Sequence, residues 1–215
     1  MNIDKFVKAW NPEPKKSFRQ RIRDVVNREP IRYKLMVVNY KIKAMVTRLE
    51  AHIARLRERD AMLFERVVEA LQQGDKQRAA VYATEVAEIR KAIKQLMIVK
   101  LALEQVSLRL ETVMTLGDTM AAIAPLAGII HELKAYVRGV MPMLSLELMD
   151  LEETLNSIVV ESGEFISMTS VSAAASGEAR KILQEAALLA EQKLREQFPE
   201  VPSAGTLASG QEAHA

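Results

Sequence analysis

The stretch VVEALQQGDKQRAAV, residues 67–81, determines the architecture, because it places a chain reversal between two long helical segments. Gly74 can adopt the left-handed backbone conformation that ends a helix, and the Asp75 side chain can cap the helix that follows. No residue breaks the helical period from Ile31 to Gln73, and a second helical segment starts at about Lys76. The sequence therefore predicts two long helices joined by a tight turn, which is an antiparallel hairpin.

Apolar residues recur along both segments at helical spacing. In the first segment they recur every seven residues, and at ~1.5 Å per residue this segment forms a rod of roughly 65 Å. In the second segment they recur at steps of three and four. We expect the two stripes to face each other and to form the hairpin core. The stripes contain Leu35, Ile42, Val46, Leu49, Ile53, Leu56, Leu63 and Val67, and then Ile89, Ile93, Leu96, Leu103, Val106, Leu110 and Val113.

Shorter helices are predicted after the hairpin. The helical pattern continues to about Arg138, with glycine and proline marking flexible points. Residues 144–160 form an acidic helix with leucines on one face and, on the other, Glu147, Asp150, Glu152 and Glu153. No β-strand is predicted. The fold class is therefore all-α, a long antiparallel helical hairpin with shorter C-terminal helices.

The chain divides into five parts. Residues 1–14 are an N-terminal helix, residues 15–165 the helical core, residues 166–177 a linker rich in small side chains, residues 178–202 a C-terminal helix with a short motif, and residues 203–215 a disordered tail. No apolar run approaches the roughly 18 residues that would span a bilayer, and no signal peptide precedes the core. We expect a cytoplasmic protein.

The first residues of the chain have the pattern of a membrane-inserting helix. Their apolar side chains fall on one stripe, which consists of Ile3, Phe6, Val7 and Trp10. A basic amphipathic helix follows, and its cations suit an anionic lipid surface: Lys15, Lys16, Arg19, Arg21 and Arg23. Each such cation contributes ~1 kcal/mol against an anionic leaflet. The apolar stripe alone or the cations alone would bind a membrane weakly. Polymerisation would strengthen both contributions, because many copies would bind the same membrane together.

Charge is distributed unevenly along the chain. Residues 1–60 carry 16 basic and 7 acidic side chains, a net charge of +9, whereas residues 101–215 carry 7 and 16, a net charge of −9. The acidic half can bind the basic half of the same molecule or of a neighbour, and the basic half can bind an anionic surface. We expect the acidic helix around Glu147–Glu153 either to restrain the basic hairpin or to pair with a neighbouring subunit.

No pattern typical of an enzyme is present. The three histidines, His52, His131 and His214, are not spaced as metal ligands, and His131 with Glu132 is predicted to be a solvated pair. The chain has no cysteine, no phosphate-binding glycine loop and no nucleophile motif. We expect neither a catalytic residue, nor a metal, nor a cofactor.

Two other functions share some of these features. A coiled-coil scaffold without membrane activity would have the same rods. A basic nucleic-acid-binding protein would use the positive N-terminal half to contact phosphates. Trp10 beside Phe6 suits lipid headgroups better than stacking on bases, so nucleic acid is not the expected partner.

Three segments together resemble the ESCRT-III (Snf7-type) family, in its archaeal cell-division branch. They are the turn at Gly74 and Asp75, the run from Arg78 to Arg90 (RAAVYATEVAEIR), and the segment from Val106 to Met120 (VSLRLETVMTLGDTM). The resemblance covers about residues 30–165, and the order of basic and acidic halves agrees with it. It implies a subunit that is closed in the cytosol, opens, and polymerises into filaments that constrict and cut membrane necks in cell division, with vesicle budding as a further task.

The resemblance also implies partners. They are further copies of the chain, ESCRT-III-like paralogues, an anionic membrane surface at the inner face of the cell membrane, and an AAA ATPase whose MIT domain binds a short C-terminal motif. Phe198, Pro199, Glu200, Val201 and Pro202 resemble the extended, proline-containing type of this motif. The helix before them resembles the helical type only in Glu191 and Leu194, and the alternative to both is an ordinary helix end followed by a disordered tail. Members that bind the membrane-recruiting ring protein carry a C-terminal winged helix, which this sequence lacks. It is thus more similar to shorter paralogues that join an existing polymer at the division site.

Overall fold

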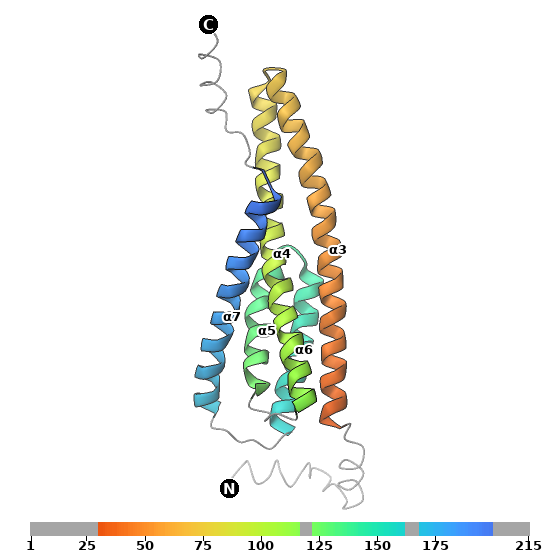
Figure 1. Cartoon of the computed structure of the whole chain (residues 1–215), viewed down its shortest axis with the longest axis vertical. Coiled ribbons are helices and arrows are strands. Elements are labelled where there is room, and N and C mark those ends of the chain that lie inside the picture. The colour runs from red at the N-terminus through yellow and green to blue at the C-terminus, as the bar shows by residue number, and fades with distance from the viewer. Residues whose placement is uncertain (1–29, 117–121, 162–167, 200–215) are drawn as a thin grey trace, which may run out of the picture.

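The computed structural model describes residues 30–116, 122–161 and 168–199. Every secondary-structure element in these ranges is a helix, and two of the helices are much longer than the others (Figure 1). The helices are α3 (Ile31–Gln72), α4 (Lys76–Leu116), α5 (Ala124–Val137), α6 (Pro142–Glu161) and α7 (Met168–Gln197). The predicted all-α class is confirmed.

The turn between α3 and α4 has the predicted chemistry. Gly74 has a φ of +75°, in the left-handed region that glycine adopts without steric cost. Its N–H donates to the carbonyl of Leu71 at 3.0 Å, and the N–H of Asp75 donates to the carbonyl of Ala70 at 2.9 Å, which together form a Schellman motif. The Asp75 carboxylate then accepts a hydrogen bond from the N–H of Arg78 at 2.9 Å. This local chemistry joins the two rods.

The predicted stripes form the core of the hairpin, but the burial of their residues differs along the rods. Leu35, Ile42 and Leu49 are buried, whereas Leu56 and Leu63 are only partly buried. In Figure 1 the shorter helices surround the lower part of the hairpin and leave the end with the turn as two helices alone. At that end Val67 and Val86 are still buried between the two rods, but they lie outside the main apolar core. One continuous apolar core therefore lies in the half of the molecule where the helices of the described ranges pack together.

A polar pair interrupts the apolar seam between α3 and α4. The Ser107 hydroxyl donates to the Asn39 side-chain oxygen at 2.6 Å, and both residues are buried. The Asn39 amide donates in turn to Glu111, which also pairs with Lys43. Because a buried polar group is stable only with its partner, this pair fixes the register of the two rods at one position.

The shorter helices cover the lower half of the hairpin. α5 packs against α4, α6 and α7, while α6 lies along α3 and α7 lies along α4. The buried face of α6 consists of the five predicted residues, Leu144, Leu148, Leu151, Leu155 and Ile158. The helix itself extends slightly beyond the predicted range of 144–160.

One predicted boundary is wrong. α7 begins at Met168, so most of the stretch predicted as a linker, residues 166–177, is helical. The prediction relied on small side chains and on Gly177, but serine and alanine do not prevent a helix, and alanine is the best helix former. The run Ala173–Ala175 favours continuation of the helix.

Several predicted features lie outside the described residues. These are the proposed membrane-inserting stripe, the cations that follow it, and the last three residues of the proposed C-terminal motif. Across residues 30–116, 122–161 and 168–199, no helix is both long enough and apolar enough to cross a bilayer.

Candidate functional site

The end of α7 is held on the hairpin by a cluster around Arg90. Arg90 lies on α4, and its guanidinium donates two hydrogen bonds to the Asp60 carboxylate on α3, at 2.8 and 3.1 Å. The Asp60 side chain is 4% exposed and that of Arg90 is 12% exposed. Such a two-pronged pair is the strongest geometry that these two side chains form. The pair therefore links the two rods about four helical turns below the hairpin turn.

Two aromatic rings complete this cluster. The guanidinium carbon of Arg90 is 5.6 Å from the ring centroid of Phe64 and 5.0 Å from that of Phe198. Both distances are in the range of cation–π attraction. The third nitrogen of the guanidinium group, Nη1, donates to the carbonyl of Pro199 at 2.6 Å. Arg90 thus contacts α3 through Asp60 and Phe64, and the end of α7 through Phe198 and Pro199.

Ion pairing supports the same end of α7. Glu191 accepts hydrogen bonds from Lys94 on α4 at 3.3 Å and from Arg195 one turn along α7 at 2.7 Å. These hydrogen bonds, first that from Lys94, lower the pKa of the Glu191 carboxyl. Leu194 packs against the apolar core from the same side. The described part of the predicted C-terminal motif, Leu194, Phe198 and Pro199, is therefore in contact with the body of the molecule.

The acidic helix α6 is bound to the basic hairpin by Glu147. The carboxylate of Glu147 accepts two hydrogen bonds from Arg48 on α3, one of them at 2.8 Å and the other shorter. The hydrogen bonds from Arg48 lower the pKa of Glu147, and the same contact raises the pKa of Arg48. At the other end of α6, Glu161 pairs with Lys34 at 2.8 Å. These two pairs join opposite ends of the α3–α6 contact, so the helices run antiparallel.

Glu152 points elsewhere, toward α5. It accepts hydrogen bonds from Lys134 and from His131, the latter at 2.9 Å. Burial opposes ionisation of Glu152, but the hydrogen bonds from these two residues outweigh it and lower the pKa of the carboxyl. The sequence predicted a solvated pair of His131 with Glu132; the structure instead pairs His131 with a carboxylate from the next helix.

The four acidic residues of α6 therefore do not form one site. Glu147 contacts α3 and Glu152 contacts α5, whereas Asp150 and Glu153 are exposed. Within the described ranges no ion pair involves either of these last two. No group of three or more histidine, aspartate or glutamate side chains is placed to hold a metal ion in this part of the chain.

The Arg90 cluster was not predicted from the sequence, although one signal for it exists. Asp60 follows Ile53 by seven residues and Leu56 by four, so it lies on the apolar stripe of α3. A charged residue on a buried stripe requires a partner of opposite charge. The identity of that partner follows only from the way the two rods pair.

Comparison with known proteins identifies the family. The chain is 48% identical over 200 residues to Cell division protein B1 of Sulfolobus acidocaldarius, and the match covers 93% of this chain and 91% of that protein. Identity of this extent over nearly the whole of both chains is decisive. The chain belongs to the archaeal cell-division branch of the ESCRT-III family.

A second relative of this ESCRT-III chain is more distant. Cell division protein B of the same organism is 41% identical over 143 residues, a match that covers 66% of this chain and 55% of that protein. The ESCRT-III chain is thus similar to two cell division proteins of one organism. No protein-family model matches the sequence, and no solved structure matches it.

Proposed function

We propose that this chain is a filament-forming subunit that binds and remodels membranes in archaeal cell division. The observation that carries the proposal is the 48% identity to Cell division protein B1, which extends over 93% of the chain. A long helical hairpin, formed by α3 and α4, suits a subunit that packs side by side with further copies. The chain then acts at the inner face of the cell membrane, at the division site.

Membrane binding is assigned to the N-terminal segment. Ile3, Phe6, Val7 and Trp10 insert among lipid headgroups, and Lys15, Lys16, Arg19, Arg21 and Arg23 bind the anionic surface. Each fully buried large apolar side chain contributes roughly 1.5 to 3 kcal/mol, before the cost of ordering the helix. Polymerisation places many such segments side by side, so assembly and membrane binding strengthen each other.

The described conformation is the closed resting state in this proposal. The acidic helix α6 is attached to basic residues of α3 through Glu147 and Glu161, and the end of α7 is attached to α4 through Arg90. Opening requires these contacts to break. The acidic helix then acts as a restraint on polymerisation.

Removal of subunits from the filament is assigned to an AAA ATPase. Its MIT domain recognises the motif around Phe198 to Pro202 in this proposal. The Phe198 ring and the Pro199 carbonyl are occupied by Arg90 in the closed state, so the ATPase binds the motif once this end of α7 has left the hairpin. Further copies of the chain and ESCRT-III-like paralogues are the other partners.

Negative-stain imaging with vesicles tests the proposal. The full chain is mixed with anionic vesicles, with neutral vesicles and with duplex DNA. We expect protein coats, tubules or constricted necks on anionic vesicles and smooth neutral vesicles. A chain that leaves anionic vesicles bare and undeformed, alone and with a longer paralogue, would not be a membrane-remodelling subunit. Salt-sensitive binding to DNA in that case would favour the nucleic-acid alternative.

A further inference from the structure

An apolar stripe is exposed at the beginning of α3, on the side that faces away from α4. It contains Tyr33, Met36, Val37 and Tyr40, which follow one another at steps of three, one and three residues and therefore share one face of the helix. Their exposed fractions run from 37% for Val37 to 75% for Tyr40. Large apolar side chains grouped in this way mark a contact surface more often than singly exposed ones do. We call these four residues the α3 stripe.

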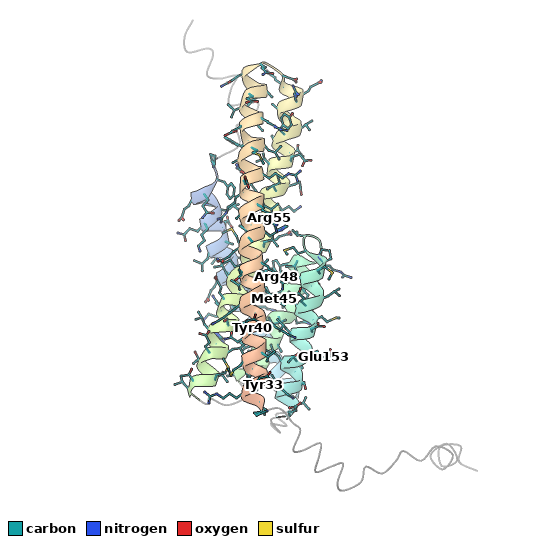
Figure 2. The ribbon with its side chains drawn as sticks, turned by 90° about the vertical axis from the view of Figure 1, so that its right-hand side faces the viewer. Tyr33, Tyr40, Met45, Arg48, Arg55 and Glu153 are labelled. Carbon is teal, nitrogen blue, oxygen red and sulfur yellow. The ribbon has the colours of Figure 1, made fainter. Side chains whose placement is uncertain are left out.

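A second apolar stripe is exposed on α6, the helix beside α3. Met143, Leu146 and Met149 recur every three residues and are each more than half exposed. Asp150 and Glu153 continue the same exposed face and form no ion pair among the described residues. We call these five residues the α6 stripe. Figure 2 shows Tyr33 and Tyr40 on α3 and Glu153 on the adjacent α6.

The two stripes lie on helices of opposite charge. Residues 31–59 of α3 contain 8 basic and 2 acidic side chains, a net charge of +6. α6 contains 5 acidic side chains and no basic one. Arg32 and Lys41 border the α3 stripe at its two ends and are both exposed. An α3 stripe therefore offers apolar side chains flanked by cations, and an α6 stripe offers apolar side chains followed by anions.

The same two helices already pack against each other inside one molecule. They run antiparallel, with Arg48 paired to Glu147 and Lys34 paired to Glu161. That contact uses one flank of each helix and leaves both stripes exposed. Inside one molecule, a basic helix packs beside an acidic helix with apolar side chains between them. The exposed flanks of α3 and α6 carry the same types of side chain as this internal contact.

We propose that the α3 stripe of one copy of this chain packs against the α6 stripe of a second copy. The pairing buries apolar surface and brings one of the two bordering cations, Arg32 or Lys41 according to the direction in which the two helices run, near Asp150 and Glu153. Pairing two α3 stripes would instead bring like charges together. Because both stripes lie on adjacent helices of one molecule, a two-fold relation between copies forms both contacts at once. This contact joins copies in the closed state, in which α6 still lies on α3, and it is distinct from the assembly that follows release of α6. It rests on the proposed function only for the expectation that copies of this chain associate.

Cross-linking tests this contact directly, because the natural sequence contains no cysteine. One variant carries Met36→Cys in the α3 stripe, and a second, with a fused tag that changes its mass, carries Met149→Cys in the α6 stripe. A third carries Leu188→Cys, at an exposed position of α7 outside both stripes. We expect disulfide-linked dimers of Met36→Cys with Met149→Cys to form roughly tenfold faster or more than dimers of Met36→Cys with Leu188→Cys, because docking raises the local thiol concentration.

Charge reversal provides a second readout on the same cross-link. Arg32→Glu with Lys41→Glu in the chain that carries Met36→Cys should abolish the advantage in rate, and so should Asp150→Lys with Glu153→Lys in the chain that carries Met149→Cys. Mixing the two reversed chains should restore it. A rate equal to that of the Leu188→Cys control, or a rate unchanged by reversal, overturns the proposal.

The outcomes separate this inference from the proposed function. If filaments form on anionic vesicles but the cross-link does not form, the proposed membrane remodelling stands and the proposed interface is wrong. If the cross-link forms rapidly but the chain does not bind vesicles, the proposed interface stands and the proposed membrane remodelling is wrong. Loss of vesicle binding in Tyr33→Asp with Tyr40→Asp, without any cross-link in the parent chain, would assign the α3 stripe to lipid and overturn the contact between copies.

Discussion

Arg90 and Asp60, 30 residues apart in the sequence, form a two-pronged pair at 2.8 and 3.1 Å that joins the rods of the hairpin and also holds the end of the last helix. The same guanidinium group lies against the rings of Phe64 and Phe198. Three segments that are distant in the sequence therefore depend on one side chain. Changes at Arg90 should affect both the hairpin and the attachment of α7.

Replacing Arg90 tests its role in stability. Arg90→Ala leaves the carboxylate of Asp60, only 4% exposed, without its partner, and breaking a buried pair in this way costs about 3 to 5 kcal/mol. We expect the free energy of unfolding in urea to fall by that amount. Lys91→Ala is the matched control, because Lys91 is the next residue and its pair with Glu88 is well exposed. Equal stability of the two variants would show that the Asp60 pair contributes nothing.

Replacing Phe198 tests the attachment of α7 alone. Phe198→Ala removes one ring from Arg90 and should cost on the order of 1 kcal/mol, because cation–π attraction at a partly exposed site has that size. Hydrogen exchange should become faster at the end of α7 and stay unchanged at the seam of α3 and α4. Leu189→Ala, an exposed residue of the same helix, should change neither region. Faster exchange throughout the hairpin would contradict this local role.

Acidification should weaken the attachment of α6. The pKa of Glu147 lies below its ordinary value of 4.5 because of Arg48, and that of Glu152 is lowered by Lys134 and His131 against the effect of burial. The folded state therefore binds fewer protons than the unfolded state in this range. The stability that these carboxylates provide is complete above the unfolded pKa and is lost as the pH falls through the folded one.

The measurement for this effect is the free energy of unfolding at a series of pH values. Between about pH 5 and about pH 3 the parent chain should lose stability with a steeper slope than Glu147→Gln with Glu152→Gln, whose side chains do not titrate. Glu153→Gln is the control, since Glu153 lies on the same helix, is exposed and has no ion pair among the described residues. Identical slopes in all three chains would contradict the assignment.

Release of α6 should favour assembly. Truncation after Met143 removes the helix that pairs with Arg48 and Lys34, so the proposed restraint on the basic hairpin disappears together with α7. Arg48→Glu weakens the same contact in the full chain, and Arg48→Glu with Glu147→Arg restores it. We expect light scattering to report a lower threshold concentration for assembly in the truncated chain and in Arg48→Glu than in the parent chain. The chain with both Arg48→Glu and Glu147→Arg should assemble at the parent threshold. An unchanged threshold and rate after truncation would rule out restraint by α6.

The sequence predicted the parts of the fold that depend on local chemistry. Gly74 and Asp75 supply the backbone conformation and the cap of the turn, and the apolar period of each rod determines which face is buried. The buried face of α6 was predicted for the same reason. The linker prediction was wrong because it counted small side chains as helix breakers, although alanine favours a helix.

The site residues depend on contacts between distant segments, so the sequence predicted them less well. The position of Asp60 on an apolar stripe signals a buried partner, but the choice of Arg90 depends on the register of two rods. The four acidic residues of α6 were predicted as one group, whereas their partners belong to α3 for Glu147 and to α5 for Glu152. Residues that are close together in the sequence of α6 therefore contact different helices in the folded chain.

The most direct test of membrane binding is co-sedimentation with anionic vesicles, comparing the parent chain with Phe6→Asp combined with Trp10→Asp. The two substitutions place charges on the proposed inserting stripe and leave the described helices untouched, which circular dichroism checks. We predict that the parent chain sediments with the vesicles and that the variant stays in solution with the same helical signal. Equal sedimentation of both chains would contradict insertion by the N-terminal stripe.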